Sequence, residues 1–311
     1  MTEMLREARS DLRPPCRQSA VRGLRIFLVG LWIVVATPTV AALDEATAIA
    51  QKPLEEHAQE RGRALAEAVF RRTQGERVVT HQRMELLDPG REPRVRELFA
   101  FRRGTDDTEH AAASLIRFSA PSDIAGMGLL TIGEIAADSE QWIYLPARSM
   151  TRRIPSGQQG ARFAGSDFFY EDLRDRNSKL DQHTWQGSVS LNGVDTEVIA
   201  SIPFDPNSSV YAKRLAWIDP ERALALRVDY FAPIAGRGSD PAEQPFKRYW
   251  VLDVGDIDGR PTVIESVMED LQSGHRTRLI NLSTSYDERI PDRLFTRRAL
   301  EDAAIERDFH P

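Results

Sequence analysis

Short runs in which apolar and polar residues alternate dominate the chain from residue 77 onward. Successive side chains of a β-strand point to opposite faces, so a period of two predicts strands. Turn residues separate the runs, and Asn192-Gly193 between two alternating runs is a strong hairpin signal. The predicted strands cover residues 77–87, 94–103, 109–119, 128–135, 141–145, 184–191, 194–202, 211–218, 223–231, 246–254, 262–270 and 276–286.

The connections between these runs are too short to hold crossover helices, which predicts antiparallel pairing. Helices are predicted only at residues 45–73, 167–176 and 292–304. An antiparallel sheet of about a dozen strands must curl, close or split in two. Curled sheets of that size commonly enclose ligand cavities. We therefore predict a mainly β (α+β) fold, in which a large curved antiparallel sheet is capped by a few helices.

The first 42 residues have a different character from the rest of the chain. Arginines precede an apolar run at residues 26–36, and small residues follow it up to Ala42. That order is typical of a cleavable secretory signal peptide. The run of about 11 residues is short for a bilayer span, and an uncleaved membrane anchor is the alternative interpretation. The predicted organisation is a signal peptide at 1–42, a helical segment at 43–76, a β domain at 77–304 and a tail at 305–311.

Composition and charge narrow the class of protein. The chain has 311 residues, a formal net charge of −6 and a pI near 5.7, and no block of Lys and Arg. These properties argue against a nucleic-acid partner. The only cysteine, Cys16, precedes the apolar run, so removal of the signal peptide would exclude disulfides and thiol catalysis.

Motifs for catalysis, metals and cofactors are absent from the sequence. The six histidines do not pair at metal-ligand spacing, and neither the Gly-x-Ser-x-Gly motif nor a phosphate-binding glycine pattern occurs. We therefore predict a protein that is not an enzyme and has no cofactor and no metal. A hydrolase is an alternative, for which Ser166 and His183 are the one candidate pair of nucleophile and base.

The stretch at residues 141–173 combines large aromatic side chains with glycines, a basic segment and paired acids. Trp142 and Tyr144 lie two apart on a predicted strand and therefore share a face. They line an apolar cavity or belong to an ordinary core, and the phenylalanines that follow have the same two interpretations. The candidates for a cavity lining are Trp142, Tyr144, Phe163, Phe168 and Phe169.

Charged residues flank these rings. Arg148, Arg152 and Arg153 are candidates for contact with a lipid headgroup or a partner protein. Their alternative role is a solvated sheet edge that discourages strand addition. Glu171 and Asp172 are expected to cap a helix and form a structural ion pair, or else to form a metal or salt-bridge site with the arginines.

The order and spacing of this stretch resemble the LolA-like family of outer-membrane lipoprotein-sorting proteins, in its divergent branch. The resemblance rests on the aromatic strand at 141–147, the basic residues at 152–154 and the Phe-x-Gly-Ser-Asp-Phe-x-Tyr-Glu-Asp-Leu motif at 163–173. Weaker matches lie at residues 117–126, 211–219 and 290–296. Together they extend over roughly residues 60 to 300.

The resemblance implies a half-open antiparallel β-barrel that is lined with apolar residues and capped by helices (LolA/LolB-like). It also implies a periplasmic carrier for the acyl chains of lipids or lipoproteins. Members of this branch are associated with inner-membrane exporters of the resistance-nodulation-division type, so such an exporter is the expected partner. The alternative is a periplasmic sensor or regulatory subunit that uses the same fold to bind a partner protein.

Overall fold

The computed structural model describes residues 40–72, 77–104, 112–133, 139–235, 240–286 and 289–310, with side chains from residue 54 onward. The predicted signal peptide lies outside the described residues except for its last three, and so does Cys16. The chain divides into a unit at residues 1–47 and a compact unit at 48–311, which is the one described below. No helix in the described part of the chain combines the length and the apolar character of a membrane span.

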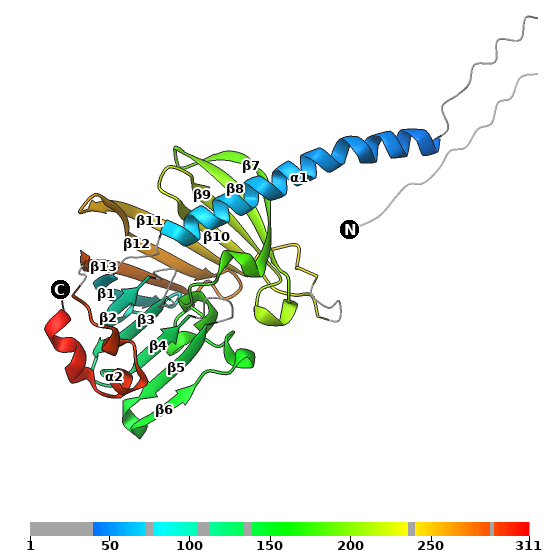
Figure 1. The fold of residues 1–311 in the computed structure, drawn as a ribbon. Helices are drawn as coiled ribbons and strands as arrows, with labels where there is room; N and C mark the ends of the chain where they lie inside the picture. Colours follow the sequence, from blue (N-terminus) through cyan, green and yellow to red (C-terminus); the bar gives the residue numbers. More distant parts are fainter. Residues whose placement is uncertain are drawn as a thin grey trace, which may run out of the picture. The chain divides into compact units, whose positions relative to one another are not determined.

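The described part of the chain forms one antiparallel sheet of 13 strands (Figure 1). Neighbours follow the order β6-β5-β4-β3-β2-β1-β13-β12-β11-β10-β9-β8-β7, so the sheet does not close. The predicted curved antiparallel sheet is confirmed as an open barrel. The strands are β1 Arg77–Leu87, β2 Arg94–Arg103, β3 Ala113–Ala120, β4 Gly128–Ile132, β5 Glu140–Leu145, β6 Met150–Arg153, β7 Asp181–Leu191, β8 Val194–Pro203, β9 Lys213–Asp219, β10 Leu224–Phe231, β11 Lys247–Ile257, β12 Arg260–Asp270 and β13 Arg276–Tyr286.

Helices are few among the described residues, and most are short 3-10 turns. The predicted helix at 45–73 corresponds to α1, but the other two predictions were wrong in extent. Residues 167–176 contain only the four-residue turn η4, and residues 292–304 contain a five-residue α-helix between two 3-10 turns. The helices are α1 Val40–Arg72, α2 Arg297–Glu301, η1 Pro146–Arg148, η2 Ser156–Gln158, η3 Phe163–Gly165, η4 Tyr170–Leu173, η5 Ser178–Leu180, η6 Pro206–Ser208, η7 Asp292–Leu294 and η8 Ala303–Phe309.

The strand order places β6 and β7 at opposite edges of the sheet, although they follow each other in the chain. The connection between them therefore crosses one face of the sheet. Its first part, residues 154–173, is called the strap. We call the face that the strap and α1 cover the inner face, and the opposite one the outer face.

Two apolar cores lie on the two faces of β1–β5. On the inner face Leu129 and Ile143 pack against Phe163 and Tyr170 of the strap. On the outer face Phe101 belongs to a cluster with the C-terminal segment, whose buried members are Ile290, Leu294, Phe295 and Leu300. Buried Arg117 fixes this segment by an ion pair of 3.1 Å to Glu306 and by hydrogen bonds to the carbonyl oxygens of Ala299 and Leu300.

Candidate functional site

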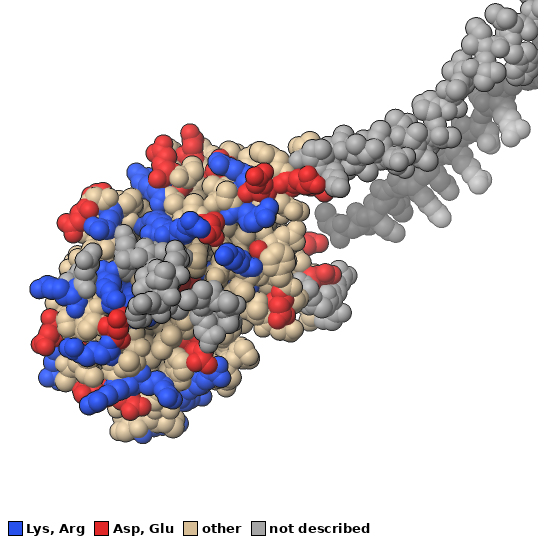
Figure 2. All heavy atoms as spheres, viewed as in Figure 1, with Lys and Arg blue, Asp and Glu red and all other residues tan. Residues whose placement is uncertain are grey.

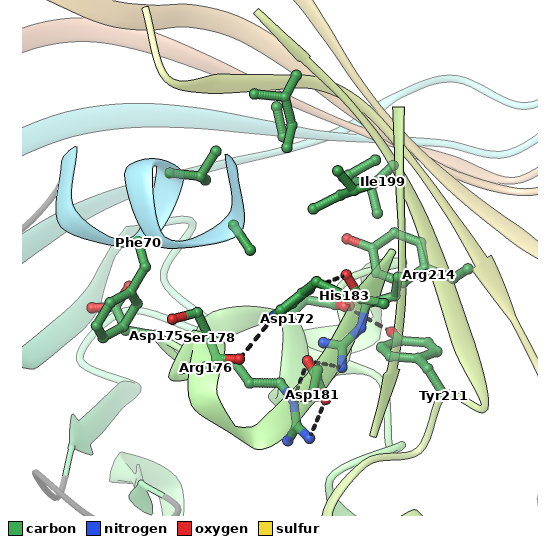
Figure 3. Close-up of a pocket in the computed structure, with 18 of the residues that line it drawn as sticks. Phe70, Asp172, Asp175, Arg176, Ser178, Asp181, His183, Ile199, Tyr211 and Arg214 are labelled. Atoms are coloured by element: carbon green, nitrogen blue, oxygen red, sulfur yellow. Dashed lines mark hydrogen bonds and ion pairs between the residues drawn. The ribbon is translucent and has the colours of Figure 1, made fainter. Parts of the chain in front are cut away.

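A cavity of about 350 Å³ lies between the C-terminal part of α1 and the inner face of β7–β10 (Figure 3). Aliphatic and small side chains form much of its wall, and charged side chains form the remainder. The apolar lining consists of Ala66, Val69 and Phe70 from α1 and Ile199, Ala216, Ile218, Ala225 and Val228 from the sheet. The size falls within the range of about 300–1,000 Å³ that is typical of ligand sites.

The register of the strands explains why this cavity is amphipathic. Side chains directly opposite each other on paired strands form rows across the inner face. One row contains Trp185, Ile199, Ala216 and Val228, which are cross-strand partners in that order. The adjacent row, one pleat repeat away, contains His183, Ser201, Arg214, Tyr230 and Lys247. An apolar row and a polar row thus run side by side, and the cavity is lined by Ile199, Ala216 and Val228 of the first and by His183, Ser201, Arg214 and Tyr230 of the second.

Ion pairs concentrate at the polar end of the cavity. Asp181 is buried and receives Arg176 at 2.7 Å and Arg214 at 3.1 Å. Arg176 also donates to the carbonyl oxygen of Ser208 at 2.8 Å, which ties β7 to the loop before β9. Figure 3 shows Arg176, Asp181 and Arg214 gathered at this end, away from Ile199. Charged hydrogen bonds of this kind are about twice as strong as neutral ones.

His183 is held at the boundary between the two environments. Its Nδ1 lies 2.8 Å from Ser201 Oγ, and its Nε2 lies 2.8 Å from the carbonyl oxygen of Ser178. A carbonyl only accepts, so Nε2 carries the proton and Nδ1 accepts from Ser201. Burial lowers the pKa of His183, which favours the neutral ring.

Helix α1 approaches the sheet closely because of one glycine. A Cβ on Gly62 would lie 2.8 Å from the backbone nitrogen of Trp185 and 2.9 Å from that of Thr184, so no side chain fits there. Leu65 and Ala66 then pack on Ile199 and Ile218. On the far side of this contact Arg61 pairs with Glu197 at 3.0 Å. Helix α1 therefore packs closely against this part of the sheet.

A second and larger hollow of about 880 Å³ adjoins the polar end. The two linings share Ser178, Asp181 and His183. The other residues of the second lining are mainly polar side chains of α1 and the exposed Phe204. The polar end of the cavity is consequently the end that faces this polar hollow.

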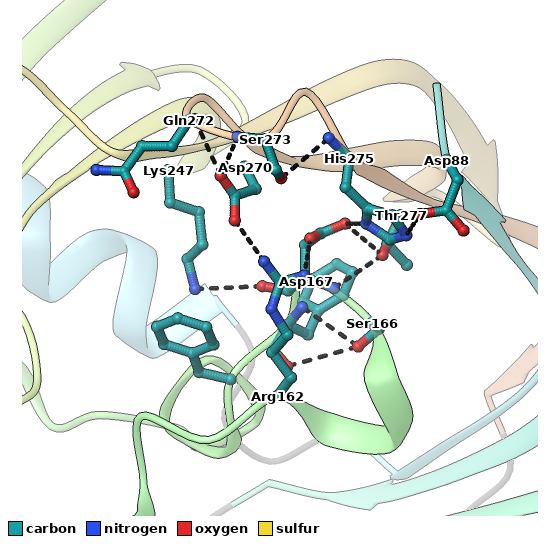
Figure 4. A network of polar contacts seen from close by, with 12 residues as sticks. Asp88, Arg162, Ser166, Asp167, Lys247, Asp270, Gln272, Ser273, His275 and Thr277 are labelled. Carbon is teal, nitrogen blue, oxygen red and sulfur yellow. Dashed lines mark hydrogen bonds and ion pairs between the residues drawn. The ribbon is translucent and has the colours of Figure 1, made fainter. Parts of the chain in front are cut away.

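The strap covers the other part of the inner face and is anchored by acidic residues of the sequence motif (Figure 4). The buried carboxylate of Asp167 lies 2.5 Å from His275 Nδ1, accepts from Thr277 Oγ1 at 2.8 Å and pairs with Arg162 at 2.5 Å. The hydroxyl of Ser166 donates to the carbonyl oxygen of Phe163 at 2.7 Å. Ser166 and His183 thus have separate partners, and the hydrolase alternative loses its candidate pair.

Glu171 and Asp172 secure the end of the strap to the segment before β9 and to β11. Glu171 accepts from the backbone N–H of Val210 at 2.6 Å, and Asp172 accepts from Tyr211 Oη at 2.7 Å. Asp172 also pairs with Lys247 at 2.5 Å, and Lys247 is only 1% exposed. Burial lowers the pKa of Lys247, while the charge of Asp172 opposes that shift. The prediction of a structural ion pair for Asp172 is confirmed, but its partner is Lys247 rather than the arginines of 148–153.

The five predicted lining residues do not meet in this cavity. Trp142 and Tyr144 lie on the outer face and pack against the C-terminal core, because Ile143 between them points inward. Phe163 is fully buried against Phe118, with 5.5 Å between ring centroids. A binding role for these side chains stays a prediction.

Phe168 and Phe169, the other two predicted lining residues, lie next to the buried lysine. Phe168 is buried near Tyr249, and Phe169 stacks on Tyr211 at 6.2 Å with Lys247 Nζ 3.7 Å from its ring centroid. A cation over an aromatic ring is attracted by the ring quadrupole. The ring of Phe169 therefore helps to enclose the ammonium group of Lys247, together with Tyr211 and Tyr230.

The three predicted basic contact residues lie at the exposed edge of the sheet. Arg152 and Arg153 belong to β6, a strand that the sequence analysis missed, and Arg148 ends η1 before it. All three are exposed, and Arg153 pairs with Glu140 at 2.5 Å. Figure 2 shows basic side chains over the part of the molecule where β5 and β6 lie. Their contact with a headgroup or partner stays a prediction.

Comparison with known proteins identifies the family. The family model that matches has the description "Uncharacterized protein" and covers residues 110–302, more than half of the chain. The chain belongs to this family. No curated protein matches it. Among the described residues, no group of His, Cys, Asp and Glu is arranged to hold a metal ion.

Solved structures with the same fold include three from bacteria. A putative outer membrane lipoprotein-sorting protein domain from Vibrio parahaemolyticus is 23% identical with a TM-score of 0.70, covering 78% of this chain and 99% of its own. A DUF1329 family protein from Desulfovibrio piger is 24% identical with a TM-score of 0.69 and the same coverage. A LolA superfamily protein from Nitrosomonas europaea is 16% identical with a TM-score of 0.59, covering 76% and 98%. The fold is therefore that of the LolA-like proteins, as the motif at 163–173 predicts.

Proposed function

We propose that the protein is a periplasmic carrier, without enzymatic activity, that binds acyl chains of lipids or lipoproteins. The observation that supports this proposal is the cavity under α1, in which an apolar row of the sheet faces apolar side chains of the helix. Burial of hydrocarbon in such a site contributes roughly 25 cal/mol per Å² of apolar surface. The neighbour from Vibrio parahaemolyticus is named for lipoprotein sorting, which is in line with this role.

Extraction of an acyl chain from a bilayer requires a membrane partner. We propose an inner-membrane exporter of the resistance-nodulation-division type, as the family resemblance implies. The signal-peptide pattern of residues 1–42 is the support for a periplasmic location.

The proposal is tested by native mass spectrometry of the full chain after gentle purification from the cell envelope. We expect an additional mass in the range of a lipid or an acylated peptide on a fraction of the molecules. Repeated absence of any such mass, together with failure to bind added lipids, would contradict the carrier function.

A sensor or regulatory subunit is the second candidate, and the edge strand β7 favours it. Residues 182–191 contain no charged side chain and no proline, and Val189 is 46% exposed. Charged side chains and prolines discourage strand addition at a sheet edge, so an edge strand without them can accept an added strand from a partner. A stable stoichiometric protein partner, recovered by pull-down without lipid, would support this candidate over the carrier.

A further inference from the structure

The polar end of the cavity under α1 presents nearly balanced charge to a ligand. Its lining includes four carboxylates and three guanidinium groups, and Lys247 pairs with one of the carboxylates. The four acids, Glu171, Asp172, Asp175 and Asp181, each have a basic side chain within 4.0 Å. A headgroup with a net charge would therefore meet no excess of opposite charge here.

Arg214 contributes a donor at this end that has no acceptor among the described residues. The buried Nε of Arg214 makes no hydrogen bond, although other atoms of its guanidinium group pair with Asp181. A buried donor without a partner costs about 1–3 kcal/mol. This Nε has almost no accessible surface, but other atoms of Arg214 line the cavity, so a small turn of the guanidinium group would bring a donor to an acceptor oxygen of a ligand.

The size of the cavity limits the apolar part of the ligand. A volume of about 350 Å³ is near the lower limit for small-molecule sites, which begin at about 300 Å³. Two or three acyl chains side by side require much more space than a single chain. The part of the apolar row that lines the cavity, Ile199, Ala216 and Val228, runs across three neighbouring strands, which suits one extended hydrocarbon chain.

From these three observations, and resting on the proposed carrier function, we propose that the cavity binds an amphiphile with one hydrocarbon chain and a headgroup of no net charge. The chain lies along the apolar row, between the sheet and α1. The head lies beside Asp181, His183 and Arg214, with an oxygen that accepts from the guanidinium group of Arg214. Any further part of the ligand extends into the adjoining polar hollow, which shares Asp181 and His183.

The experiment compares three probes with the full chain, each below its critical micelle concentration where it has one. Lysophosphatidylcholine has one chain and a zwitterionic head, palmitate has one chain and a negative head, and phosphatidylcholine has two chains. Native mass spectrometry and calorimetric titration are expected to show one lysophosphatidylcholine per protein, bound at least tenfold more tightly than either of the others. Equal or tighter binding of palmitate or phosphatidylcholine would overturn the proposal.

Two substitutions in the lining test whether lysophosphatidylcholine binds in this cavity. Ala216→Phe fills the apolar row and is expected to lower the affinity for lysophosphatidylcholine at least tenfold, whereas Ala304→Phe at an exposed site leaves it unchanged. Arg214→Lys keeps the charge but removes the planar guanidinium group, and a severalfold loss of affinity is expected. Circular dichroism and thermal melting identify any variant that fails to fold. Binding that survives both cavity variants in folded protein would place the ligand elsewhere and contradict the proposal.

The outcomes separate this inference from the carrier function. Recovery of a two-chain or anionic lipid from the cell envelope would leave the carrier function standing and reject the single-chain ligand. Absence of every lipid, both from the envelope preparation and in the titrations, would reject both.

Discussion

The two parts of the inner face are covered in different ways. Under the strap, buried side chains such as Phe163 and Ile143 are packed with other apolar residues, and the acids of the strap are held by partners that are distant in the sequence. Under α1, the contact depends on Gly62 and a few small apolar residues, and a cavity of about 350 Å³ remains. The motif at 163–173 therefore builds a closely packed cover, whereas α1, outside that motif, encloses a cavity together with Glu171 and Asp172 at the end of the strap.

Removal of the buried cation beneath the strap is expected to have the largest effect. Lys247→Met leaves the carboxylate of Asp172 buried without its charged partner, which typically costs about 3–5 kcal/mol. The free energy of unfolding, measured by urea denaturation, gives this loss. Lys179→Met, which changes an exposed lysine, is the control and is expected to stay within about 0.5 kcal/mol. A loss below 1 kcal/mol for Lys247→Met would show that the strap does not depend on this pair.

A matched pair of truncations compares the two parts directly. Ile143 and Ile199 are both buried on the inner face, one under the strap and one beside the cavity. Ile→Ala substitutions cost about 2–5 kcal/mol, and the cost rises with the empty volume that they create. We expect Ile143→Ala to cost at least 1 kcal/mol more than Ile199→Ala in urea denaturation, because Ile199 already borders a space. Equal costs would mean that the two covers are packed equally well.

The loss of stability at low pH is expected to come partly from His183, which lines the cavity under α1. Burial lowers the pKa of His183 in the folded state, so the unfolded chain binds its proton first as the pH falls. His183 is thus expected to lower stability as the pH drops below its unfolded pKa of about 6.5, with a slope of at most about 1.4 kcal/mol per pH unit. Denaturation curves between pH 7 and pH 5 should be flatter for His183→Gln. An unchanged slope would assign the acid response to other groups.

The smallest effect on stability is expected at the exposed edge strand β6. Arg152→Val with Arg153→Val removes exposed charges, and surface changes of this kind are usually within about 0.5 kcal/mol per site. Self-association should increase, because charged side chains on an edge strand discourage pairing with another chain. Light scattering over a range of protein concentrations checks this. An unchanged molar mass would leave the basic residues available for the headgroup or partner contact.

Much of the fold could be predicted because the determining signals are local. The strands at 77–87, 94–103 and 276–286 have the predicted bounds, since alternation and turn residues act within a few positions. β6 was missed because its four residues include two arginines and do not alternate. The helix at 167–176 was wrong in extent because its acids are held by side chains far away in the sequence, and only the short turn η4 forms. Asp172 caps that turn by accepting from the backbone N–H of Phe169, and Asp167 and Asp172 also bind Tyr211, Lys247, His275 and Thr277.

The candidate site was harder to predict from the sequence than the fold was. The polar row of His183, Ser201, Arg214, Tyr230 and Lys247 exists only because the pairing register aligns five strands. Alternation on each strand does predict which residues share a face, so Ser201 could have been placed with Ile199. The close approach of α1 at Gly62 has no local signal of this kind.

The connection from β6 to β7 joins the two free margins of the sheet. This connection has a fixed contour length, and contacts of Asp167 and Asp172 attach it to the sheet. Its length therefore limits how far the two edge strands can separate. The covalent linkage therefore limits how far the barrel can open, so the proposed carrier is expected to accept wider cargo by displacement of α1.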